Sequence, residues 1–158
     1  MTTTKPPAFD PSSLEQHKGS LYPEPFKSRM GDRAKRRLGE AAGLTQFGVN
    51  LVELGPHARS ALRHFHTHED ELVYVLEGEV VLCTNDGEQL LHAGQFAAFK
   101  AGVHDGHCLV NRSKAKVRYL EIGSRIIEDV AHYPDDYLMW SKDERGREVA
   151  AHKDGKRY

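Results

Sequence analysis

From Leu44 onward, hydrophobic residues occur in short runs that are separated by turn-forming residues. The runs are rich in Val, Leu, Phe and Tyr, and Gly, Asn, Asp or Pro stands between most of them. One such turn, Asn85-Asp86-Gly87, has the sequence of a tight hairpin. Short strands at regular spacing predict an all-β fold, and about eight of them suit a double-sheet jelly roll. The predicted strands cover residues 46–54, 60–66, 71–77, 79–84, 88–92, 95–100, 107–111 and 117–123.

The run Leu72-Val73-Tyr74-Val75-Leu76 is hydrophobic at every position. A strand with one solvated face would alternate between apolar and polar residues, so both faces of this strand are expected to be covered. One face lines the interior of the fold. The other is covered by the N-terminal arm or by another subunit, which predicts a homodimer. The alternative is coverage by the C-terminal segment of the same chain.

The segments on either side of these strands are more polar. We expect residues 1–43 to form an extended N-terminal arm, loose over about the first twenty residues, and residues 44–125 to form the β-barrel. Residues 126–158 are expected to form a peripheral C-terminal extension that packs on the barrel, with at most one helical turn. Its first residues, 126–130, are expected to complete the last strand.

Residues 27–37 carry six basic side chains. Such a stretch could contact a phosphate or carboxylate group of a ligand. The alternative, which the interruption by Asp32 favours, is a solvated basic segment.

Composition limits the class of protein. The 158 residues suit one domain with a core, and a net charge of −1 gives no general attraction to nucleic acid. No apolar run is long enough for a transmembrane helix, and the N-terminus lacks the apolar core of a secretory signal. Cys83 and Cys108 do not form a disulfide framework, and we expect two buried thiols. A cytoplasmic protein without membrane or nucleic-acid partners is therefore expected.

His64 and His66 are the first candidate metal ligands. Alternate residues of a strand point to the same face, so the two imidazoles would lie side by side. Residues 67–70 are polar and can turn the chain, after which Glu71 opens the next strand. Imidazole nitrogen and carboxylate oxygen together suit divalent Zn, Fe, Mn, Ni, Co or Cu.

This pattern carries a family resemblance. The sequence His64-x-His66-x4-Glu71-x6-Gly78 resembles the first conserved motif of the cupins, except that Ala58 stands where that motif has its first glycine. The wider chain is similar to small bacterial single-domain cupins of the sugar-phosphate-isomerase type. The resemblance implies a jelly-roll barrel and a metal bound by His64, His66 and Glu71.

A second cupin motif is visible further on. The segment from Gly94 through Lys100 and Gly102 to His107-x3-Asn111 resembles it, with Lys100 in place of proline and a turn lengthened by two residues. The resemblance implies a fourth ligand at His107. Different assignments stay open: Asp105 by counting from Gly102, and also His104, His68, Glu69 and Asp70.

Three imidazoles and one carboxylate leave open coordination positions, which is typical of a catalytic site. The expected function is metal-assisted proton transfer, of isomerase or lyase type, on a small polar substrate such as a sugar phosphate or hydroxy acid, with one Zn, Mn, Fe or Ni ion. Candidate catalytic residues are Tyr74, Tyr119 and Glu71, and strand alternation does not choose between the tyrosines. The alternatives are an Fe-dependent dioxygenase and a non-catalytic cupin that binds a metal or small ligand as a sensor or store.

Overall fold

A six-stranded antiparallel sheet forms the main layer of the computed structural model, which describes residues 7–158. The two central pairs of strands are hydrogen-bonded along nearly their full lengths, and Glu71 lies directly opposite Gly123 of the adjacent strand. In order across the sheet, the strands are β1 (His17–Lys18), β2 (Arg33–Arg37), β3 (Phe47–Leu54), β10 (Val117–Ser124), β5 (Glu71–Glu77) and β8 (Phe96–Phe99).

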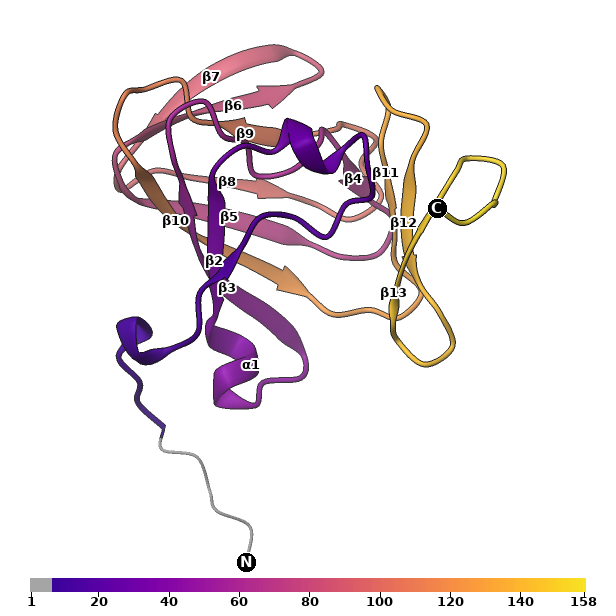
Figure 1. Ribbon diagram of the computed structural model, residues 1–158, viewed down its shortest axis with the longest axis horizontal. Helices are drawn as coiled ribbons and strands as arrows, with labels where there is room; N and C mark the ends of the chain where they lie inside the picture. The colour runs from indigo at the N-terminus through magenta and orange to yellow at the C-terminus, as the bar shows by residue number, and fades with distance from the viewer. Residues whose placement is uncertain (1–6) are drawn as a thin grey trace, which may run out of the picture.

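A second sheet packs against one face of the first (Figure 1). It contains β7 (Gly87–His92), β6 (Glu79–Thr84) and β9 (Cys108–Val110), with the predicted hairpin turn between β6 and β7. The core between the sheets includes Val52, Val75, Leu109 and Tyr119. This arrangement confirms the predicted all-β jelly roll, and β5 and β6 have the predicted bounds. The expected barrel is not closed, because its strands are divided between separate hydrogen-bonded sheets.

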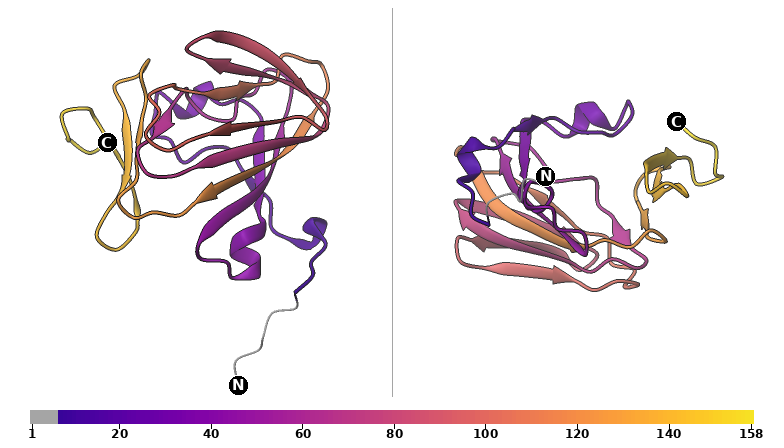
Figure 2. Two further views of the ribbon diagram at one scale, coloured as in Figure 1. Left: turned by 180° about the vertical axis from the view of Figure 1, so that it is seen from behind. Right: turned by 90° about the horizontal axis from the view of Figure 1, so that it is seen from below.

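The C-terminal extension is a sheet of its own. It contains four short strands: β4 (Phe65–His66), β11 (Val130–His132), β12 (Met139–Lys142) and β13 (Glu148–Ala151). Of the strand predicted over residues 60–66, only β4 forms. This sheet stands at one end of the jelly roll (Figure 2) and packs through a second core that includes Leu62, Tyr133 and Leu138. The extension, which the structure describes throughout, is thus built of strands and contains no helical turn.

The expected continuation of the last strand through residues 126–130 was wrong. Strand β10 ends at Ser124, and a turn leads into β11. The turn is fixed by Asp129, whose carboxylate accepts hydrogen bonds from the backbone amides of His68 and Glu69.

The N-terminal region is only partly an arm. Short 3₁₀ turns at Pro11–Ser13 and Lys27–Arg29 and the helix α1 (Leu38–Ala42) flank β1 and β2, and β2 pairs with β3 over five residues. Half of the basic segment is thus a strand of the main sheet. The expectation of a loose arm over residues 1–6 lies outside the described residues. Among the described residues, no helix has the length and apolar character needed to cross a membrane.

Candidate metal centre

Two elements far apart in the sequence bring the candidate ligands together. His64 and His107 form an isolated antiparallel bridge, with backbone N···O distances of 3.1 and 2.9 Å in the two directions. His66 follows on β4, and Glu71 is the first residue of β5, after the polar turn. A backbone pair therefore places the first and second motifs side by side.

The side chains of these residues converge on one carboxylate oxygen. Oε2 of Glu71 lies 3.0 Å from Nε2 of His107, 3.6 Å from Nε2 of His66 and 3.7 Å from Nε2 of His64. Donor atoms of His64, His66 and Glu71 all lie within 4.8 Å of one another, and His107 joins them through Glu71. This arrangement has the spacing that a single metal ion requires.

The protonation states suit metal binding. Burial disfavours the charged form of Glu71, but hydrogen bonds from His107 and His64 hold its pKa well below the ordinary value. Burial lowers the pKa of His107, which favours the neutral imidazole that acts as a ligand. Nδ1 of His107 is buried without a hydrogen-bond partner among the described residues. The ionised carboxylate of Glu71 beside the neutral imidazole of His107 is part of the donor set that a divalent transition metal prefers, so these residues fit such an ion.

Asp129 positions His66 and was not found by sequence reasoning. Its Oδ2 lies 2.7 Å from Nδ1 of His66, and the Asp129 side chain is buried. Burial raises the pKa of Asp129, but hydrogen bonds from His66 and the backbone outweigh this and bring it to about 2. The ionised carboxylate therefore accepts a hydrogen bond from Nδ1–H of His66 and directs Nε2 towards Glu71. Burial lowers the pKa of His66, but Asp129 and Glu71 outweigh this and raise it, so a metal that binds at Nε2 displaces a proton. No local signal marked Asp129, because its partner is 63 positions away in the sequence.

A second group of possible ligands combines His66, Glu69 and Asp129. Glu69, however, forms an ion pair with Lys142 and accepts a hydrogen bond from the backbone amide of Ile126. Asp129 is already occupied by backbone amides and by His66. These partners favour a positioning role for both carboxylates.

The remaining candidate ligands lie outside the cluster. His68 is exposed and contacts its neighbour Thr67, while the ring of His104 stacks on Phe65. The carboxylates of Asp70 and Asp105 are also engaged elsewhere, because they accept hydrogen bonds from the backbone amides of Ala101 and Asn85, respectively.

The two tyrosine candidates lie on opposite faces of the main sheet. Tyr74 is 39 % exposed on the outer face of β5, away from Glu71, because the two are an odd number of residues apart. Tyr119 lies fully buried on the inner face of β10. Burial raises its pKa well above the ordinary value, and its hydroxyl has no hydrogen-bond partner among the described residues. The structure thus shows that only Tyr119 faces the interior, a distinction that strand alternation in the sequence did not provide.

The inner face also carries a carboxylate that is not part of the ligand cluster. Glu121 of β10 lies opposite Val73, two residues from the position opposite Glu71, and is half-buried. Its Oε2 accepts a hydrogen bond of 3.0 Å from Nδ2 of Asn50. A second titratable group therefore faces the same interior as the candidate metal ligands.

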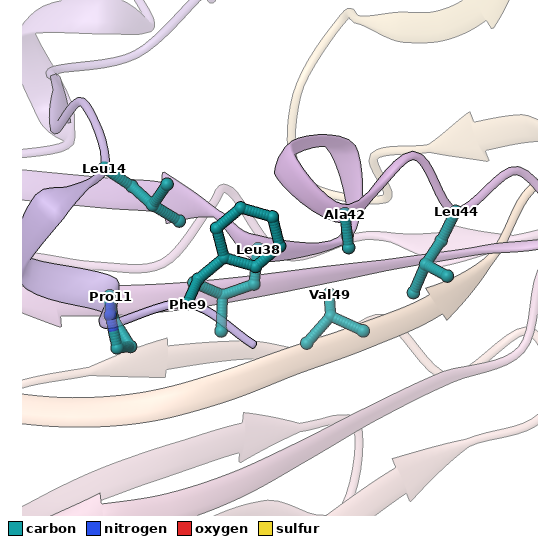
Figure 3. A pocket seen from close by; sticks show the side chains of 8 residues that line it. Phe9, Pro11, Leu14, Leu38, Ala42, Leu44 and Val49 are labelled. Carbon is teal, nitrogen blue, oxygen red and sulfur yellow. The ribbon is translucent and has the colours of Figure 1, made fainter. Parts of the chain in front are cut away.

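An apolar hollow of about 250 Å³ lies away from this cluster (Figure 3). It is formed between residues 9–14 of the N-terminal arm, α1 and Val49 of β3. Its lining has no titratable side chain, so it does not extend the candidate metal centre.

Comparison with known proteins identifies the family of this chain. The family model described as a cupin domain matches residues 50–123. A solved sugar phosphate isomerase of the cupin superfamily from Silicibacter pomeroyi is 43 % identical, with 96 % of each chain covered and a TM-score of 0.91. The chain belongs to the cupin family.

Less similar structures share the architecture. A structure from Acidithiobacillus ferrooxidans, provisionally named a sugar phosphate isomerase, is 27 % identical, covers 81 % of both chains and has a TM-score of 0.71. A Thermotoga maritima protein, named a predicted oxalate decarboxylase, is 20 % identical over 75 % of this cupin and 99 % of its own chain, with a TM-score of 0.61, and shows the fold alone. Among curated proteins, none matches this cupin.

Proposed function

We propose that this cupin is a metal-dependent enzyme that transfers a proton on a small polar substrate, in an isomerase or lyase reaction. The observation that carries the proposal is the convergence of three imidazole Nε2 atoms on Oε2 of Glu71, at 3.0 to 3.7 Å. Four protein ligands leave positions in a five- or six-coordinate shell for substrate oxygens.

A divalent ion in this cluster would supply Lewis-acid polarisation of a substrate oxygen. The other parts of the reaction fall to the chain itself. Glu121, held by Asn50, is the group that takes up and returns the proton, since it is a half-buried carboxylate beside the cluster and not one of its ligands. Asp129 orients the His66 ring through its hydrogen bond to Nδ1 and so directs Nε2 towards Glu71.

The substrate class rests on the relatives. The 43 % identical protein from Silicibacter pomeroyi is named a sugar phosphate isomerase, and so, provisionally, is the one from Acidithiobacillus ferrooxidans. Aldose–ketose isomerisation moves a proton between adjacent carbons, which is the chemistry proposed for Glu121. We therefore propose a sugar phosphate or a hydroxy acid as the substrate.

Metal analysis tests the first half of the proposal. Protein purified without a histidine tag is expected to contain about one equivalent of Zn, Mn, Fe or Ni by mass spectrometry. The His66→Ala variant is expected to lose it. A wild-type protein that remains metal-free after reconstitution would overturn the metal-dependent enzyme.

Proton exchange tests the second half. Metal-loaded protein is incubated in D₂O with aldose phosphates, ketose phosphates and hydroxy acids, and deuterium incorporation is followed by NMR. Wild type is expected to label the carbon next to a carbonyl or hydroxyl group, and Glu121→Gln is expected to bind metal normally but to label at least a hundredfold more slowly. Metal binding without labelling of any of these compounds would leave a non-catalytic cupin.

A further inference from the structure

Strand β2 presents three cationic side chains to the interior of the jelly roll. Residues that lie directly opposite one another in an antiparallel pair share a face. Lys35 lies opposite Val52 and Arg33 lies opposite Leu54, and both of these partners belong to the core between the sheets. Arg37 lies opposite Asn50, the residue that holds Glu121. The basic segment is therefore not simply a solvated surface.

Two of the three cations have no carboxylate partner. The guanidinium of Arg37 bonds to Glu40 at 3.2 Å, and Arg36, which points to the outer face, pairs with Glu53 at 3.0 Å. By contrast, neither Lys35 nor Arg33 has a carboxylate within 4.0 Å among residues 7–158. The only hydrogen bond that the Arg33 side chain makes with these residues is to the carbonyl of Gly19, at 3.4 Å.

Burial makes this lack of partners costly. Lys35 and Arg33 are both half-buried, and burial lowers the pKa of Lys35 in spite of an opposing attraction from Glu121. Partly buried charges in proteins are normally paired, because removal of a charge from water is unfavourable. An anion bound between these side chains would supply the missing partner.

Two tyrosine hydroxyl groups lie near the histidines of the candidate metal centre. The hydroxyl groups of Tyr22 and Tyr133 lie 3.1 Å apart, and the ring of Tyr133 lies 5.6 Å from that of His64. Burial raises the pKa of Tyr22 to about 12, and the charges of Arg33 and Glu121 also act on it. Tyr22 is therefore close enough to Arg33 to feel its charge, and it is linked through Tyr133 to His64.

The buried hydroxyl of Tyr119 gives an independent indication of a ligand. It lies on the same inner face, between Val52 and Val75, and has no hydrogen-bond partner among the described residues. Burial raises its pKa, and charges at both ends of the interior, Arg33 on one side and Glu71 on the other, contribute to its value. Ser60 lies close enough to lower this pKa but makes no hydrogen bond of normal geometry to the hydroxyl. Buried hydroxyl groups are normally satisfied, so the Tyr119 hydroxyl can still bond to a polar group of a ligand.

We propose that Lys35 and Arg33 form a subsite for an oxyanion of the substrate, either phosphate or carboxylate, and hold that end while the metal binds the other. Three strand spacings, about 14 Å, separate β2 from β5, and the long side chains on both strands reduce this gap to the length of a small substrate. The proposal rests on the proposed function, because it assigns a second subsite to the same interior.

Anion titration of the full chain tests the subsite. Inorganic phosphate and D-glycerate, which stand for the two kinds of oxyanion, are titrated calorimetrically into wild type and Lys35→Met. Methionine keeps an apolar stem of similar length but removes the charge. Arg36→Met is the matched control, because it removes the same charge from the outer face of the same strand. Metal-free and metal-loaded forms are both titrated, since a metal also binds these anions directly.

The metal-free and metal-loaded wild type are expected to bind at least one of the two anions, and the stronger one identifies the kind of oxyanion. Lys35→Met is expected to weaken this binding about tenfold or more in both forms, while Arg36→Met leaves it unchanged. Equal affinity of wild type and Lys35→Met, or no binding of either anion to wild type, would overturn the subsite. Metal content, measured on the same samples, reports separately on the proposed function, and thermal unfolding shows whether each variant is folded.

Discussion

At the scale of single residues, the candidate metal centre combines ligands that are close in sequence with a positioning residue, Asp129, that is distant in sequence. His64, His66 and Glu71 lie within eight positions, and the alternation of a strand with a polar turn accounts for their approach. His107 was ambiguous in the sequence because the turn after Gly102 is lengthened; its bridge to His64 shows where it lies. Asp129 could not be predicted, because only the pairing of β11 with β4 brings it to His66.

The hydrogen bond from His66 to Asp129 leads to the first prediction. Replacement of Asp129 with Asn removes the ionised acceptor that fixes the His66 tautomer, so metal affinity is expected to fall by about 10- to 100-fold. Competitive titration with a chromophoric chelator measures the change. Asp135→Asn is the control, since Asp135 pairs with Arg63 at the surface. Equal metal affinity of Asp129→Asn and wild type would contradict the positioning role.

The same residue predicts how stability depends on acid. The pKa of Asp129 falls from an ordinary 3.8 to about 2 in the folded protein. A lowered pKa gives stabilisation that is fully present above about pH 4 and is lost as the pH falls towards 2. Urea unfolding of the metal-free protein between pH 5 and 2 is expected to show this loss, and Asp129→Asn is expected to show a smaller one. An unchanged slope in the variant would contradict the assignment.

At the scale of elements, the sequence pattern predicted the strands of the two sheets that enclose the main core, but it did not predict the strands of the C-terminal sheet. Strands β5 and β6 were predicted to the residue, because their apolar runs are bounded by Gly78 and by the Asn85-Asp86-Gly87 turn. Strands β11 to β13 were missed. They are short, and their residues are mostly half-buried, so no alternation marks them. The inward orientation of Lys35 also could not be read from a basic run, since only its register with Val52 reveals it.

The second core gives a prediction about these late strands. Leu138 is fully buried against Phe26, Leu62 and Tyr133. Its replacement with Ala is expected to lower the free energy of unfolding by about 2–5 kcal/mol, through lost burial and a cavity. Urea denaturation measures this loss. Ile127→Ala, at a position 58 % exposed, is the control and should change stability by less than about 0.5 kcal/mol. A similar effect of both variants would show that the C-terminal sheet adds no cooperative packing.

At the scale of the whole molecule, the outer face of the main sheet has exposed apolar side chains on β5 and β8. Tyr74 and Phe96 lie opposite each other on β5 and β8, and with Leu76 they are 39–61 % exposed. Neither the described part of the N-terminal arm nor the C-terminal sheet covers these side chains fully. The structure therefore does not provide the intramolecular cover that was the alternative to a second subunit.

The homodimer stays a prediction, and this face is where we expect it to form. Phe96→Asp places a charge at the most exposed of these three apolar side chains and is expected to convert dimer to monomer. Sedimentation velocity at micromolar concentration measures the change, and Ile127→Asp, at the exposed turn before β11, serves as the control. A monomeric wild type would refute the dimer.

The pairing of β4 with β11 has a consequence for how the molecule responds to its metal. His66 contacts Glu71 of the ligand cluster on one side and pairs with β11 of the C-terminal sheet on the other. The free energy of metal binding is therefore linked to the free energy of ordering this sheet. Metal binding that restrains His66 is expected to restrain the C-terminal strands. Ordering of those strands is expected to strengthen metal binding by the same free energy. The rate of proteolysis in the last thirty residues is thus expected to report whether the metal site is filled. A protease that cuts between β12 and β13 would cut the metal-loaded protein more slowly than the metal-free one.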